Sequence, residues 1–120
     1  MTPRILIADD SETVTSLLTV ALQTSGYDVE TAKDGVETYE AGKTGDFDLV
    51  VLDQLMPGLL GLEVIQKWRN EGVEHKVIML SGVDDDRFVV DSFEMGAIDY
   101  VRKPFRLPEL LVRIKQRLDT

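Results

Sequence analysis

The chain has 120 residues, which suits a single domain over residues 1–120 with one hydrophobic core. Its formal net charge of -9 would repel a phosphate backbone, so we expect no direct nucleic-acid binding by this domain. The chain has no cysteine, which excludes disulfides and thiolate chemistry. It also has no apolar run long enough to span a membrane and no secretory signal, so we expect a cytoplasmic domain without a membrane partner.

Apolar and amphipathic segments alternate through the first half of the chain. Residues 5–8 form a short β-branched run that predicts a strand, and a predicted helix follows and ends at Gly26. Residues 27–32 predict a second strand, and a more polar helix through Tyr39 is expected to end near Gly45. The first helix has apolar residues at helical spacing: Val14, Leu17, Leu18, Ala21 and Leu22.

Three further pairs of strand and helix are predicted in the second half. The helix over residues 84–96 begins with acidic residues, which the helix macrodipole favours, and is expected to bury Phe88, Val89 and Phe93. The helix after Gly61 has its apolar residues on one face, among them Trp68. Strands are predicted at residues 48–53, 76–82 and 97–101, and helices from Gly61 to Gly72, over residues 84–96 and from about Pro108 to Leu118.

Strands that are continuously apolar and alternate with helices predict an α/β fold with a parallel sheet covered on both faces. The carboxyl ends of parallel strands meet at one edge of a sheet, where ligands usually bind. Five polar residues lie at or just past the carboxyl ends of the predicted strands: Asp9, Asp10, Asp53, Ser81 and Lys103. Each alone has an ordinary explanation as a helix cap, a turn residue or a surface charge.

Together these residues indicate a specific chemistry. Three carboxylates in one pocket would repel one another by several kcal/mol unless a cation neutralised them, and one lysine is not enough. Mg2+ prefers a few carboxylate ligands and keeps water positions for a phosphate oxygen. A carboxylate nucleophile, a hydroxyl and an ammonium beside that ion are suited to phosphoryl transfer onto an aspartate.

The chain resembles the receiver domain of two-component response regulators over essentially its whole length. The matching stretches are "ILIADDSE", "VVLDQLMPGLLG", "VIMLSG" and "DYVRKPF", in the expected order and at the expected separations. The resemblance implies a single doubly wound, flavodoxin-like sheet of five parallel strands in the order 2-1-3-4-5. It also implies a cis peptide bond between Lys103 and Pro104.

The resemblance implies a role for each residue of the acidic group. Asp53 would accept a phosphoryl group from a sensor histidine kinase or a phosphotransfer protein. Asp10 and Asp53 would ligate Mg2+ together with the backbone carbonyl of Leu55, and Asp9 would assist through water. Such a domain is no enzyme for other substrates, since it catalyses only its own phosphoryl transfer and dephosphorylation.

The resemblance also implies how phosphorylation is reported. Ser81 and Lys103 would bind the phosphoryl oxygens, and Tyr100 would turn inward as Ser81 moves, changing the face formed by the fourth helix, fifth strand and fifth helix. That face would control an output domain or effector protein, or a phosphorylation-dependent homodimer. Because Leu55 and Val83 are apolar where polar side chains can orient an attacking water, we expect slow self-dephosphorylation.

Two other function classes share parts of this pattern. A flavin-binding module could have the same topology, although the loop after the first strand is acidic where a bound phosphate needs N–H donors. A hydrolase with an aspartyl-phosphate intermediate normally has an acid two residues after its nucleophile, where this chain has Leu55. His75 is expected to be a solvated loop residue without a role. The chain is either a complete regulator or, as we favour, the receiver part of a longer one.

Overall fold

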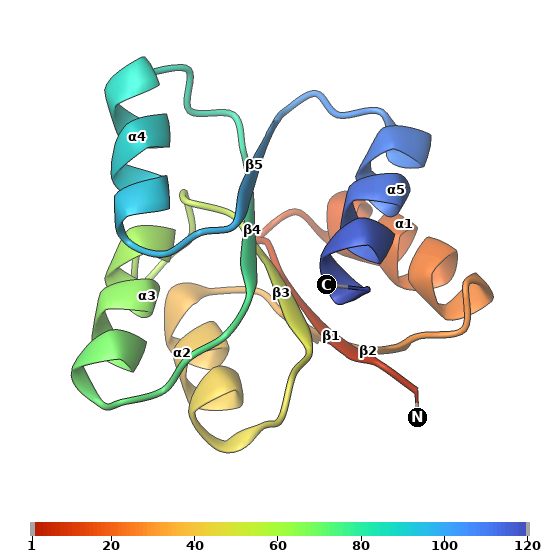
Figure 1. Cartoon of the computed structure of the whole chain (residues 1–120), viewed down its shortest axis with the longest axis horizontal. Coiled ribbons are helices and arrows are strands. Elements are labelled where there is room, and N and C mark those ends of the chain that lie inside the picture. The colour runs from red at the N-terminus through yellow and green to blue at the C-terminus, as the bar shows by residue number, and fades with distance from the viewer. Residues whose placement is uncertain (1, 120) are drawn as a thin grey trace.

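The computed structural model describes residues 2–119, which form a parallel sheet of five strands in the order β2-β1-β3-β4-β5 (Figure 1). This confirms the predicted α/β fold and strand order. The strands are β1 (Arg4–Ala8), β2 (Asp28–Ala32), β3 (Leu49–Leu52), β4 (Val77–Ser81) and β5 (Asp99–Arg102). The helices are α1 (Glu12–Thr24), α2 (Gly35–Thr44), α3 (Gly61–Asn70), α4 (Asp86–Glu94) and α5 (Leu107–Leu118). Over the described residues, no helix has the length and apolar character needed to cross a membrane.

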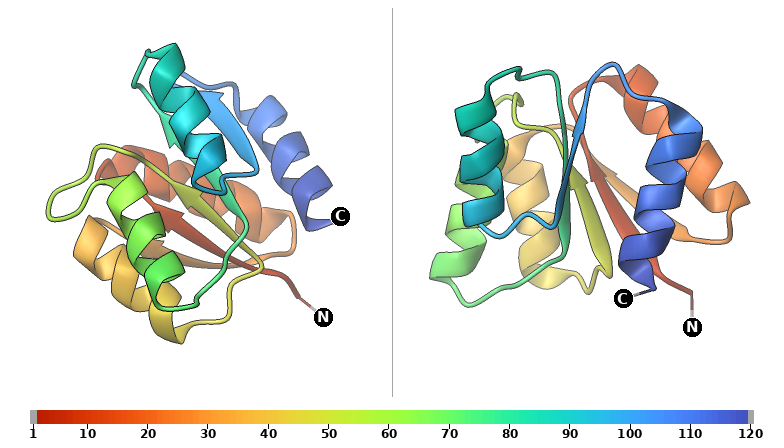
Figure 2. Two further views of the ribbon diagram at one scale, coloured as in Figure 1. Left: turned by 60° about the vertical axis from the view of Figure 1, so that its left-hand side comes forward. Right: turned by 45° about the horizontal axis from the view of Figure 1, so that its top comes forward.

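The helices cover both faces of the sheet, α1 and α5 on one side and α2, α3 and α4 on the other (Figures 1 and 2). Alternate residues of the central strands therefore enter two separate cores. In β1, Ile5 and Ile7 pack on the side of α1 and α5, whereas Leu6 and Ala8 pack on the opposite side. Burial on both faces explains why the central strands are continuously apolar.

Polar side chains cap three of the helices. Ser11 accepts a hydrogen bond from the Val14 N–H at the start of α1, and Asp34 caps α2 in the same way. Asp85 accepts from the Arg87 N–H at the start of α4. These bonds satisfy N–H groups that have no partner within the first turn of a helix.

The prediction that α4 buries Phe93 is wrong, since this side chain is 46% exposed. Ser92 is the buried residue of α4, and Phe88 and Val89 are half-buried. The helix turns the side that carries Phe88 and Ser92 toward the sheet, which leaves Phe93 about 100° round the helix axis from Ser92. Leu17 of α1 is likewise 46% exposed, although it shares the helical spacing of the core residues.

The prediction that His75 is solvated is also wrong. Its ring is half-buried, with Nε2 2.8 Å from the carbonyl oxygen of Gly42, and its edge packs against Trp68 at a centroid distance of 4.8 Å. Since a carbonyl only accepts, Nε2 carries the proton in this bond. The loop before β4 is therefore tied to the end of α2.

The side chain of Trp68, on α3, is buried against α2, and Gly42 of α2 makes this packing possible. The indole Nε1 donates to the carbonyl oxygen of Tyr39 at 3.1 Å, which fixes the ring. A Cβ atom added at Gly42 would lie 2.1 Å from Cζ2 of Trp68. The close contact requires glycine even though glycine weakens a helix interior.

We predict that Gly42→Ala destabilises the protein. Alanine favours the helix by about 1 kcal/mol over glycine, but overpacking against a fixed ring costs typically about 1–3 kcal/mol. The clash should therefore outweigh the gain in helix propensity and lower the melting temperature, measured through Trp68 fluorescence. Glu40→Ala, at an exposed position of the same helix, is the matched control and should leave the melting temperature nearly unchanged. An unchanged melting temperature for Gly42→Ala would contradict this account.

Candidate functional site

Three carboxylates gather at the carboxyl ends of β1 and β3. Ala8 and Leu52 are partners in the register of these two strands, so the residues that follow them lie side by side. Asp9, Asp10 and Asp53 each offer an oxygen within 4.8 Å of the others. Asp9 and Asp53 are buried and Asp10 is exposed. The juxtaposition expected from the sequence is thus present.

Lys103 extends its ammonium into this acidic group from the loop after β5. Its Nζ lies 2.6 Å from Oδ2 of Asp9 and 3.3 Å from Oδ2 of Asp53. Burial lowers the pKa of Lys103, but the hydrogen bond to Asp9 and the two carboxylate charges outweigh it and hold this pKa above its ordinary value. The Lys103 N–H donates to the carbonyl oxygen of Ser81, and the following peptide bond, to Pro104, is cis as expected.

Asp53 lies in an environment that opposes its negative charge. Burial raises its pKa, the ammonium of Lys103 opposes this, and the neighbouring Asp9 charge raises the pKa further, with a net increase. Oδ1 of Asp53 also accepts a long hydrogen bond, 3.4 Å, from the Leu55 N–H. One ammonium therefore compensates the acidic group only in part.

The donor set fits a hard divalent cation. Asp9, Asp10 and Asp53 carry three negative charges against the single positive charge of Lys103, and all their donor atoms are oxygens. Such an arrangement suits Mg2+, which prefers oxygen ligands and a small number of carboxylates. The role of the Leu55 carbonyl remains a prediction, while its side chain is 58% exposed.

Ser81 and Tyr100 meet at one peptide segment beyond β4. The Ser81 side chain is fully buried, and its Oγ accepts from the Val83 N–H at 3.2 Å. The Tyr100 hydroxyl donates to the Val83 carbonyl oxygen at 3.0 Å, and its ring packs edge-on against Phe88 at 5.9 Å. Burial raises the pKa of Tyr100 above its ordinary value. Ser81 therefore binds the backbone N–H of Val83, and Tyr100 binds the carbonyl oxygen of the same residue.

Arg102, which links β5 to the start of α4, was not among the functional residues predicted from the sequence. Its guanidinium pairs with Asp84 at 2.7 Å and with Asp86 at 3.4 Å, and it lies 5.8 Å from the centre of the Tyr100 ring. The run of three aspartates at residues 84–86 was the available signal, but the partner of Asp84 and Asp86 lies on β5.

Gln54 was also not among the residues predicted from the sequence. It is 8% exposed, and its Oε1 accepts from the Leu62 N–H at 2.8 Å. The signal was an amide side chain directly after Asp53, within a segment that is otherwise apolar up to Pro57.

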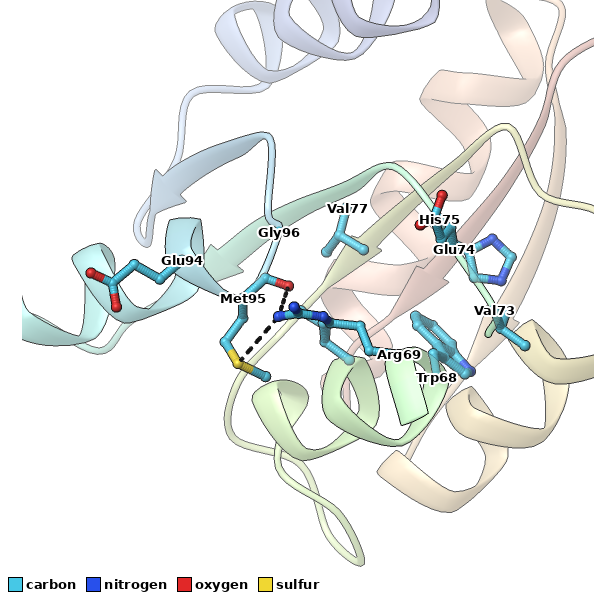
Figure 3. A pocket seen from close by; sticks show the side chains of 10 residues that line it. Trp68, Arg69, Val73, Glu74, His75, Val77, Glu94, Met95 and Gly96 are labelled. Carbon is cyan, nitrogen blue, oxygen red and sulfur yellow. Dashed lines mark hydrogen bonds between the residues drawn. The ribbon is translucent and has the colours of Figure 1, made fainter. Parts of the chain in front are cut away.

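A cavity of about 310 Å³ lies at the opposite edge of the sheet, between the end of α3, the loop before β4 and the end of α4. Figure 3 shows Arg69 reaching across it to Met95, whose carbonyl oxygen lies 3.4 Å from the Arg69 Nη1, while the Glu94 side chain points away. Val77, at the amino end of β4, is part of its lining. This cavity is thus remote from the acidic group, which we take as the candidate site.

Known proteins resemble this chain over most of its length. Residues 5–115 match the family described as the response regulator receiver domain. The alkaline phosphatase synthesis transcriptional regulatory protein PhoP of Bacillus subtilis (strain 168) is 40% identical over 115 residues, which cover 96% of this chain and 48% of PhoP. Response regulator MprA of Mycobacterium sp. (strain KMS) is 41% identical over 118 residues, which cover 98% of this chain and 51% of MprA. The chain spans about half the length of these curated relatives.

Solved structures show the same fold over the full chain. The receiver domain of the Francisella response regulator 1452 superposes with a TM-score of 0.92 at 29% identity, covering 98% of each chain. The response regulator TrrA of Thermotoga maritima, solved in complex with Mg(2+)-BeF, gives a TM-score of 0.84 at 36% identity, covering 97% of this chain and 99% of TrrA. The BeF3 activated DrrB receiver domain gives 0.89 at 32% identity, covering 100% of both chains. The sequence match and the fold together show that this chain belongs to the response regulator receiver domain family of two-component signalling.

Proposed function

We propose that this domain is a phosphorylation-dependent switch that accepts a phosphoryl group on Asp53 from a sensor histidine kinase or a phosphotransfer protein. The observation that carries the proposal is the convergence of three carboxylates and the Lys103 ammonium at one edge of the sheet. The Mg(2+)-BeF complex of TrrA and the BeF3 activated form of DrrB support the same chemistry in relatives.

Asp10, Asp53 and the Leu55 carbonyl would hold Mg2+, with Asp9 assisting through water. When bound, Mg2+ supplies positive charge against the phosphoryl oxygens. The protein's own part is positioning: the register of β1 and β3 holds Asp53 beside the other acids, and the Asp9 carboxylate keeps the Lys103 ammonium aimed at Asp53.

In the transfer step, a carboxylate oxygen of Asp53 attacks the phosphorus atom of the donor. The new O–P bond forms as the bond from phosphorus to the leaving group breaks, and that bonding pair stays with the imidazole nitrogen of a phosphohistidine or the carboxylate oxygen of an acyl phosphate. Lys103 and Ser81 would donate hydrogen bonds to the phosphoryl oxygens. The reaction thus needs Asp53 ionised, although burial opposes its ionisation.

Ser81, whose oxygen now accepts from the Val83 N–H, would then donate its O–H to the phosphoryl group and move toward it. A charge-assisted hydrogen bond of about 1.5–3 kcal/mol shifts a two-state equilibrium by roughly ten- to a hundred-fold. Since Tyr100 bonds the Val83 carbonyl, movement of this segment would reach Tyr100 and the face of α4, β5 and α5. Exposed apolar side chains on α4, Val90 and Phe93, are available for a partner surface to cover.

The curated relatives support an output beyond this domain. Several are named transcriptional regulatory proteins or response regulators, and this chain spans about half of their length. We therefore assign residues 1–120 to the receiver part of a longer regulator, whose output domain, effector or homodimer is controlled through the α4, β5 and α5 face.

The cost of an ionised Asp53 predicts how stability depends on pH in the presence of a metal chelator. The pKa of Asp53 is raised on folding, so its contribution to stability is full below the ordinary carboxyl pKa and is lost as the pH rises through the folded-state value. Asp53→Asn should therefore melt at a higher temperature than the unaltered protein at neutral pH, with a difference that shrinks on acidification. Asp46→Asn, at an exposed loop position, should show no such trend. A difference independent of pH would contradict the argument.

The direct test of the proposed function is the intact mass of the protein after incubation with Mg2+ and a small acyl phosphate. We expect a gain of one phosphoryl group, lost on Asp53→Asn or on Mg2+ chelation and retained on Asp46→Asn. No gain from either the acyl phosphate or a cognate kinase, with the protein folded, would leave a receiver fold that works by binding alone.

Leu55 and Val83 are apolar at positions near the phosphoacceptor where polar side chains can orient water, and we therefore predict a long phosphoryl lifetime. Leu55→Asn places an amide at an exposed position beside Asp53, where it can orient an attacking water. A net hydrogen bond of about 1 kcal/mol in the transition state corresponds to roughly fivefold faster loss of the phosphoryl group, followed by intact mass over time. Leu17→Asn, exposed on α1, is the matched control. An unchanged lifetime in Leu55→Asn would refute the expectation.

A further inference from the structure

Gln54 joins the phosphoacceptor loop to the start of α3. Its side-chain Oε1 accepts from the Leu62 N–H at 2.8 Å, and its main-chain carbonyl oxygen accepts from the Gly61 N–H at 2.9 Å. One residue thus makes two hydrogen bonds to the first turn of the helix.

The first turn of α3 needs these bonds. The N-cap residue is Leu60, whose side chain has no oxygen to accept a backbone N–H. Glu63 bonds back to the Leu60 N–H at 2.8 Å, and the free N–H groups of Gly61 and Leu62 are the ones that Gln54 satisfies. The buried side-chain amide of Gln54 therefore replaces the N-cap side chain by accepting from the Leu62 N–H.

The start of α3 lies directly against the backbone of Asp53. A Cβ atom added at Gly61 would be 2.5 Å from the carbonyl oxygen of Asp53, a distance that real Cβ contacts do not reach. The position of α3 therefore limits the position of the phosphoacceptor backbone.

The peptide unit between Gln54 and Leu55 connects these contacts. Its carbonyl accepts from the Gly61 N–H, and its N–H, that of Leu55, donates to Oδ1 of Asp53. A rotation of this peptide would break the bond to α3 and the bond to the carboxylate at once. It would also turn the next peptide, which carries the Leu55 carbonyl.

We propose that Gln54 is a positioning residue for the Mg2+ and phosphoacceptor site. By bonding the Leu62 N–H, its side chain fixes the peptide that orients both the Asp53 carboxylate and the Leu55 carbonyl. The proposal rests on the proposed function for the identity of the site, and it adds a residue that touches neither Mg2+ nor the phosphoryl group.

The test compares Gln54→Met, which has similar length but no such acceptor, with the unaltered protein in calorimetric titration with Mg2+. Loss of a residue that orients metal ligands costs roughly tenfold in affinity at the low end, so we expect a dissociation constant for Mg2+ about tenfold higher. Gln66→Met, on the exposed side of α3, is the matched control.

A second readout separates positioning from stability. The rate of phosphorylation by an acyl phosphate should need more Mg2+ in Gln54→Met but approach the unaltered maximum at saturating Mg2+. Melting temperatures with chelator show whether the variant is folded, and Gln54→Asn, which is too short to reach Leu62, repeats the measurement if Gln54→Met does not fold. Unchanged Mg2+ affinity in the folded variants would overturn this inference alone. Intact Mg2+ binding without phosphoryl transfer in the unaltered protein would overturn the proposed function alone.

Discussion

Two buried carboxylates that share one ammonium are the constraint on which the rest of this structure depends. Asp9 and Asp53 lie close together because each directly follows a residue of the paired strands β1 and β3, in which Ala8 is opposite Leu52. Lys103 reaches both carboxylates from the loop after β5. Burial of an ionised carboxylate is costly unless a partner compensates it. The apolar strands that bury these acids therefore stabilise the fold and, at the same edge, create a demand for positive charge that Lys103 meets only in part.

Much of this arrangement could be predicted from the sequence because parallel strands bring their carboxyl ends together whatever their order. The positions of Asp9, Asp53 and Lys103 after apolar runs were enough to expect a common site. The order 2-1-3-4-5 did not follow from periodicity, since several parallel orders would cover both faces equally well. It came from the resemblance of whole motifs to a known family.

The contacts that sequence reasoning missed depend on packing between distant elements. His75 was expected in water, but its partner is the Gly42 carbonyl, 33 residues earlier in the chain. Phe93 is apolar and still exposed, because the orientation of α4 on the sheet decides which side it buries. From the sequence alone Gln54 resembles an ordinary turn residue, because its amide oxygen accepts from the Leu62 N–H only once α3 packs beside it. Residue type predicts the capacity for such bonds, whereas the fold selects which of them form.

The strengths of the contacts around α4 explain why this region is suited to report a change at Asp53. The central strands are buried on both faces, whereas the start of α4 is held to β5 by exposed ion pairs of Arg102 with Asp84 and Asp86. Exposed pairs of this kind contribute about 1 kcal/mol or less each. A charge-assisted bond from Ser81 to a phosphoryl group, at about 1.5–3 kcal/mol, is larger than either pair and far smaller than the burial energy of the core. Under the proposed phosphorylation of Asp53, a bond of that strength would rearrange the β4–α4 segment and leave the sheet intact.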